Sequence, residues 1–156
     1  MRTTRHDLSS TTRTAVLASL APALATAIDL GLSAKQAHWN VRGLQFAPLH
    51  ALFDQVATEA GAWADALAER AVQLGGVADG TVAGVARGTA LAAYPANVTD
   101  GAAHLAAVAD RLAGFARLTR AAIATTDDAG DAVTADLFTE LTAGADKLLW
   151  MVEAHL

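Results

Sequence analysis

Cysteine is absent from this 156-residue chain, and aromatic residues make up only 5% of it. The absence of cysteine excludes disulfide bonds and the thiolate ligands of zinc fingers and iron–sulfur clusters. Lysine occurs only at Lys35 and Lys147, and the formal net charge is -5. An acidic chain with so little lysine is a poor candidate for strong nucleic-acid binding through its overall field. Such a chain attracts cations instead.

A membrane-spanning segment is also not expected, because no stretch reads as long and apolar enough to cross a bilayer. The segment Met1–Ala27 imitates a secretory signal, since arginines precede an apolar run that ends in small residues. Asp7 in the basic region and Pro22 in the apolar run argue against a signal. We therefore expect residues 1–10 to form a short tail and the protein to be cytoplasmic, with nucleoid association left open.

No segment alternates polar and apolar residues as a strand does, whereas four segments repeat apolar residues at helical spacing. A Gly-containing linker at Val77–Asn97 is long for neighbouring helices, so we expect it to cross a bundle lengthwise and to hold a short helix around Val82–Arg87. The sequence thus predicts an all-α, ferritin-like four-helix bundle in a single domain, residues 1–156. The first expected helix is Ser10–Val41, with a kink or a lost hydrogen bond at Pro22. The second runs from Ala47 to Gly75–Gly76 and the third spans Thr99–Ala124. An acidic turn at Thr126–Asp131 leads into the fourth, Asp131–Ala154.

The second predicted helix has two faces of different chemistry. At about 100° per residue, one side gathers His50, Asp54, Asp65 and Glu69. These four potential metal ligands lie away from the stripe that faces the bundle core. That core stripe consists of Leu52, Phe53, Val56, Ala60, Trp63, Leu67 and Leu74.

The spacing of the four ligand-type residues is palindromic. The midpoint of His50 and Glu69 coincides with the midpoint of Asp54 and Asp65, and small residues such as Gly61 lie near it. Within one straight helix the two aspartates are about 16 Å apart, while metal–ligand bonds are roughly 2.0–2.2 Å. Either these residues are ordinary solvated surface, or a second copy crosses antiparallel and two equivalent sites form between subunits.

His38 and Lys35 on the first helix fall in phase with its core stripe, where apolar residues are expected. A histidine there is often only a hydrogen-bonded structural residue, yet this one shortly precedes the helix that carries His50. Two histidines with three carboxylates form a ligand set suited to iron or zinc, with manganese as a further candidate. Binding requires neutral imidazole, so affinity should fall as the pH drops through the histidine range.

The stretch KQAHWN from Lys35 to Asn40, followed by Arg42-Gly43 and by LH at Leu49-His50, resembles the diagnostic signature of the Dps family of mini-ferritins. The resemblance implies a hollow dodecamer that protects cells under starvation and oxidative stress. Its ferroxidase centres lie at two-fold interfaces, oxidise Fe(II) preferentially with hydrogen peroxide, and feed a ferric mineral store. The implied ligands are His38, His50 and Asp54 from one subunit, and Asp65 and Glu69 from its partner.

The resemblance also assigns supporting and pore positions. Lys35 and Trp39 match family positions beside the metal; the alternative roles are a solvated charge for Lys35 and packing for Trp39. Asp131, Asp136 and Glu140 match carboxylates that line a three-fold iron-entry pore. Asp131 is equally plausible as a helix N-cap, and Asp136 and Glu140 are equally plausible as solvated surface. His104 and His155 match no motif and are expected to be structural or surface residues.

The tail departs from the family pattern, because DNA-binding members carry a lysine-rich extension there. Here the tail holds Arg2 and Arg5 but no lysine, so DNA binding should be weak or absent. The alternative function is a chromosome-compacting protein in which the metal matters little. A helical adaptor without metal chemistry would leave the five matched ligands unexplained.

Overall fold

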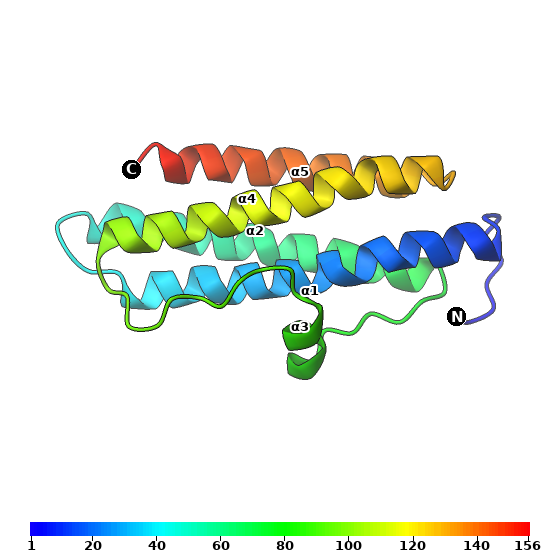
Figure 1. Cartoon of the computed structure of the whole chain (residues 1–156), viewed down its shortest axis with the longest axis horizontal. Coiled ribbons are helices and arrows are strands. Elements are labelled where there is room, and N and C mark those ends of the chain that lie inside the picture. The colour runs from blue at the N-terminus through cyan, green and yellow to red at the C-terminus, as the bar shows by residue number, and fades with distance from the viewer.

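A computed structural model describes all 156 residues and contains five helices and no strand (Figure 1). The chain forms an all-helical, ferritin-like bundle, as the sequence predicted. In Figure 1, α1 and α2 run antiparallel beside each other, and α4 and α5 form a second antiparallel pair. The helices are α1 (Ser10–Asn40), α2 (Phe46–Gln73), α3 (Val82–Gly88), α4 (Gly101–Asp128) and α5 (Ala132–Glu153).

Local capping sets where the long helices begin. The side chains of Ser9, Asp100 and Asp131 accept hydrogen bonds from backbone N–H groups at the starts of α1, α4 and α5. Pro22 lies inside α1 and lacks an N–H, so one helical hydrogen bond is missing there. The helix nevertheless continues, and the Thr26 hydroxyl donates to the Pro22 carbonyl at 2.6 Å.

The segment between α2 and α4 returns along the length of the bundle, as predicted. It starts at the end of α2, carries α3 against α1, and ends beside the α1–α2 turn, where the Arg42 N–H donates to the Thr99 carbonyl at 2.9 Å (Figure 1). Hydrogen bonds from Thr89 to Asp29 (2.7 Å) and from Ala90 to Thr26 (3.1 Å) fix its middle to α1. Because α2 and α4 point the same way, a connection of this length is unavoidable.

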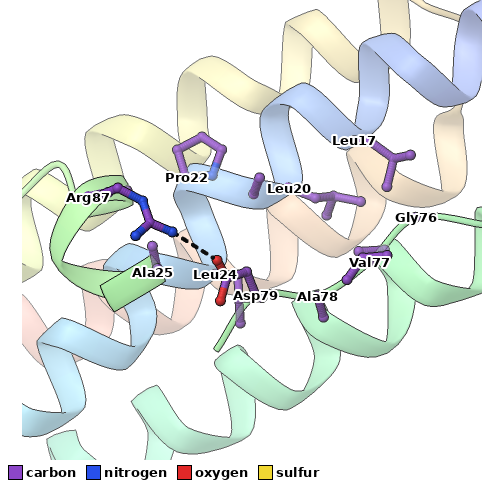
Figure 2. A pocket seen from close by; sticks show the side chains of 14 residues that line it. Leu17, Leu20, Pro22, Leu24, Ala25, Gly76, Val77, Ala78, Asp79 and Arg87 are labelled. Carbon is purple, nitrogen blue, oxygen red and sulfur yellow. Dashed lines mark hydrogen bonds and ion pairs between the residues drawn. The ribbon is translucent and has the colours of Figure 1, made fainter. Parts of the chain in front are cut away.

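An apolar groove of about 460 Å³ lies between α1, α3 and the first part of this crossover (Figure 2). The Asp79–Arg87 ion pair, 3.4 Å long, borders it. Leu17 lines the groove beside Gly76, where a Cβ atom would lie only 2.4 Å from Leu17 Cδ2. The crossover therefore needs glycine at this point to leave α2 so close to α1.

The core lies between the four long helices. Phe53, Phe115 and Phe138 are fully buried, and Trp63 stacks on Phe115 with ring centroids 5.2 Å apart. Each such side chain contributes about 1.5–3 kcal/mol through burial. The predicted core stripe of α2 is confirmed, since all seven of its members are buried.

Two expectations from the sequence are wrong. Thr126–Asp128 belong to α4 rather than to a turn, because Thr126 is buried and the reversal is made by Gly130 with φ 86°. No segment was expected to be able to span a membrane, yet α1 is long and apolar enough to do so by length and composition alone. Leu20, Leu24 and Leu30 of that helix are buried in the core. The core helix of a soluble protein can have the same length and composition, so the apolar character of α1 is weak evidence for a membrane.

Candidate metal site on α1 and α2

The antiparallel pairing of α1 and α2 brings His38 and His50 together. His38 Nδ1 lies 2.7 Å from the carbonyl oxygen of His50, and His50 Nδ1 lies 2.8 Å from the carbonyl oxygen of His38. The rings stack with centroids 3.6 Å apart and an interplanar angle of 20°. A carbonyl oxygen only accepts, so each ring in its neutral form carries its proton on Nδ1 and keeps the lone pair on Nε2. This is the tautomer in which Nε2 binds a metal, with Nδ1–H held by an acceptor behind it.

Aromatic side chains flank the histidine pair. Phe46 stacks on His50 with a centroid distance of 5.0 Å. Trp39, next to His38, is 67% exposed, and Phe46 is 46% exposed. Large apolar side chains left so open beside polar ligands are typical of a surface that another molecule covers.

One helical turn further along α2, Asp54 forms an ion pair and hydrogen bond with Lys35. Hydrogen bonding to the Lys35 ammonium is the main reason why the pKa of Asp54 is lowered, and partial burial opposes it. The carboxylate is thus ionised and half-exposed, with the ammonium as its counter-charge. A metal ion that uses Asp54 must displace Lys35 or share the carboxylate with it.

Asp65 and Glu69 lie on the same face, toward the other end of α2, and both are exposed. Neither carboxylate makes a hydrogen bond or ion pair within the chain. His50 and Glu69 are separated by about 28 Å of helix rise. Within the chain, no group of three or more histidine, aspartate or glutamate side chains could hold a metal ion. The structure therefore joins His38 with His50 and Lys35 with Asp54, but leaves Asp65 and Glu69 apart from them.

Small side chains fill the face between these two groups. Thr58, Gly61 and Ala62 are exposed, and nothing lies within 4 Å of where a Gly61 Cβ would stand. The Thr58 hydroxyl is turned back to the Asp54 carbonyl at 2.9 Å. The centre of the face is thus low and nearly free of protruding groups.

Arg70, the neighbour of Glu69, had no role predicted from the sequence, and its side chain ties this end of α2 to the start of α5. Its guanidinium reaches α5, where it donates to both Asp131 oxygens at 2.9 and 3.0 Å and to the Thr134 hydroxyl at 2.8 Å. Burial alone would raise the pKa of Asp131, yet hydrogen bonds from Thr134 and Arg70 outweigh it and lower that pKa. On the helical wheel Arg70 falls on the core stripe of α2, a signal that could have revealed it.

The proposed pore carboxylates differ in their surroundings. Asp131 is 2% exposed and caps α5 through the Thr134 N–H at 3.0 Å, so its reading as an N-cap is confirmed. Asp136 and Glu140 lie exposed one turn apart on α5.

His104 and His155, which match no motif, lie away from the candidate site. His104 is buried, with Nδ1 2.7 Å from the Tyr94 hydroxyl, and His155 lies exposed near the C-terminus. The expectation that they are structural or surface residues is confirmed.

Known proteins resemble this chain along nearly its whole length. The ferritin-like domain family matches residues 17–156. The DNA protection during starvation protein of Agrobacterium fabrum is 43% identical over 153 residues, which cover 98% of this chain and 94% of that protein. A Dps structure from Mycobacterium smegmatis superposes with a TM-score of 0.94 at 32% identity, covering 99% and 94% of the two chains. Dps from Microbacterium arborescens in a high-iron form gives 0.88 at 33% identity, covering 94% and 95%.

Proposed function

Because this chain belongs to the Dps family of ferritin-like proteins, we propose that two copies of it together oxidise Fe(II) and that the assembled shell stores the ferric product. The observation that carries the proposal is the division of ligands on one helix face. His50 and Asp54 lie toward one end of α2, with His38 of α1 beside them, and Asp65 with Glu69 lie toward the other end. Neither group can hold a metal alone.

A two-fold axis through the middle of the exposed α2 face would complete both groups at once. The axis would place His50 of one subunit beside Glu69 of the partner subunit, and Asp54 beside the partner's Asp65. The low surface around Gly61 supports close approach of the two helices. Two equivalent sites then follow from the symmetry of the dimer.

The ligand set suits oxidation of iron. Imidazole nitrogen retains Fe(II), whereas several carboxylates favour the more highly charged Fe(III). Two Fe(II) ions each give one electron to a molecule of hydrogen peroxide, whose O–O bond breaks to yield two hydroxide ions. Lys35 keeps Asp54 ionised before iron arrives. Zinc and manganese, which accept the same donors, are the expected competitors.

Iron storage requires a closed shell, which we propose to be a dodecamer built from these two-fold dimers. The Dps of Microbacterium arborescens that shares this fold is described in a high-iron form, which supports iron as the cargo. The exposed pair Asp136 and Glu140 is the proposed lining of a three-fold entry pore. Asp131 would hold the start of α5 in place beside that pore rather than bind iron, since its carboxylate is paired with Arg70.

Protection of DNA would follow from the removal of Fe(II) and peroxide rather than from direct binding. The chain is acidic and its first ten residues contain two arginines and no lysine. A gel shift at low salt checks this point. Retardation of DNA that disappears when Arg2 and Arg5 are replaced would instead favour a chromosome-compacting protein.

The proposal is tested by mixing inactive subunits. His50→Ala and Glu69→Ala should each abolish rapid peroxide-dependent oxidation after anaerobic loading with Fe(II). A dimer of one His50→Ala chain and one Glu69→Ala chain has one damaged site and one intact site. Co-expression should therefore restore about a quarter of the wild-type sites under random pairing.

The matched control co-expresses His38→Ala with His50→Ala. Both substitutions damage the same half of the site, so mixing should restore nothing. Recovery in this control, or none in the His50→Ala and Glu69→Ala mixture, would rule out the shared site.

A further inference from the structure

The N-terminal segment Met1–Leu8 does not extend freely from α1 but folds back on the end of α2 (Figure 1). The Arg2 N–H donates to the Gly75 carbonyl at 2.7 Å, and Arg2 Nη2 donates to the Val72 carbonyl at 2.9 Å. Arg13 from the first turn of α1 adds a bond to the Leu74 carbonyl at 3.0 Å. Three hydrogen bonds thus hold the C-terminal end of α2.

The end of α2 is built to receive this segment. Gly75 adopts φ 85°, and the N–H groups of Gly75 and Gly76 close the helix onto Val72 (3.0 Å) and Ala71 (2.9 Å). The carbonyls of Leu74 and Gly75 still need donors, which the Arg13 side chain and the Arg2 N–H supply, and the Arg2 guanidinium adds a second hydrogen bond to the Val72 carbonyl. A Cβ on Gly75 would lie 2.8 Å from the Arg2 carbonyl oxygen, so the close approach requires glycine.

Glu69 lies directly beside this contact. Arg2 and Glu69 line the same shallow depression, together with Val72 and Gln73. The Glu69 carboxylate has no partner within the chain, so only its backbone fixes where it points. That backbone is held on one side by Arg70, which reaches α5. On the other side it is held through Val72, which accepts from Arg2.

We propose that Met1–Leu8 is a strap that holds the last turn of α2 and thereby positions Glu69 for the site completed by a partner subunit. The inference rests on the proposed function. Arg2 acts as a positioning residue rather than a ligand, because its guanidinium carries no lone pair for a metal. The strap also withdraws Arg2 from any role in a free basic arm.

Arg2→Ala tests the strap, and Arg5→Ala is the matched control. Arg5 is exposed in the same segment and makes no hydrogen bond, so its loss removes equal charge without touching α2. Arg2→Ala should weaken anaerobic Fe(II) binding about three- to tenfold. It should raise KM for Fe(II) while kcat stays near wild type, and Arg2→Lys should rescue part of the loss. Hydrogen exchange of amides 70–76 should speed up in Arg2→Ala only.

Identical iron binding and exchange in Arg2→Ala and wild type would overturn the strap. Equal weakening by Arg2→Ala and Arg5→Ala would also overturn it, because charge rather than position would then be responsible. Circular dichroism and assembly size confirm that the variants fold. If the wild-type protein binds no Fe(II), the proposed function fails, while the exchange measurement still decides whether the strap exists.

Discussion

Replacing Asp131 with asparagine tests whether this carboxylate is a structural counter-charge. The side chain is 2% exposed and accepts four hydrogen bonds: two from Arg70, and one each from the N–H and hydroxyl of Thr134. Asparagine preserves size and N-capping ability, but it leaves the Arg70 guanidinium buried without a counter-charge. Breaking a buried pair from one side costs about 3–5 kcal/mol.

That cost corresponds to a large shift in melting temperature. Each kcal/mol lowers Tm by about 2–4 °C in a chain of this size, so Asp131→Asn should lower it by about 6–20 °C. Calorimetry at matched protein concentration measures the shift, because assembly itself stabilises the fold. Asp136→Asn is the control, since that exposed side chain makes no hydrogen bond or ion pair and its replacement should change stability by less than about 0.5 kcal/mol.

Acid should reproduce the effect of the substitution. The pKa of Asp131 is lowered by hydrogen bonds from Thr134 and Arg70 against the cost of burial. The stabilisation is therefore present above the unfolded-state pKa and is lost as the pH falls through the lower folded value. Removing both charges with Arg70→Met and Asp131→Asn together should recover part of the loss. If Asp131→Asn has the same melting temperature as the Asp136→Asn control but takes up iron more slowly, Asp131 acts in the iron-entry pore and is not a structural counter-charge.

Three further predictions concern single positions. Tyr94 is the only tyrosine, and burial raises its pKa to about 12. Ultraviolet titration should show this value, and the folded protein should lose stability as the pH rises from about 10 through about 12. Ionisation of Tyr94 near pH 10 would contradict its burial. Gly61→Leu should prevent formation of the two-fold dimer, so size-exclusion chromatography should show smaller particles, while Gly61→Ala should assemble normally. An intact Gly61→Leu assembly would place the interface elsewhere. Gly76→Ala should cost about 1–3 kcal/mol by denaturant unfolding, because its Cβ meets Leu17 at 2.4 Å; an unchanged midpoint would show that Leu17 moves without penalty.

The sequence alone determined the helices and the chemistry of the α2 face. Helical periodicity is local, so it separates the buried stripe through Phe53 and Leu67 from the face that carries His50 and Glu69. The fixed rise of a helix also showed that one chain cannot bring His50 and Glu69 together. The end of α4 was missed because the acidic stretch Thr126–Asp131 resembles a turn, whereas Thr126 is buried in the folded chain.

Only the tertiary structure decided how these side chains are held. The reciprocal bonds of His38 and His50 depend on the register between α1 and α2, which no local pattern specifies. Arg70 and Asp131 are 61 residues apart, so the partner of each could not be read from its own helix. The strap from Arg2 to Gly75 depends in the same way on where α1 begins beside the end of α2. Contacts of this kind arise when the helices pack, because packing rather than spacing sets their distances.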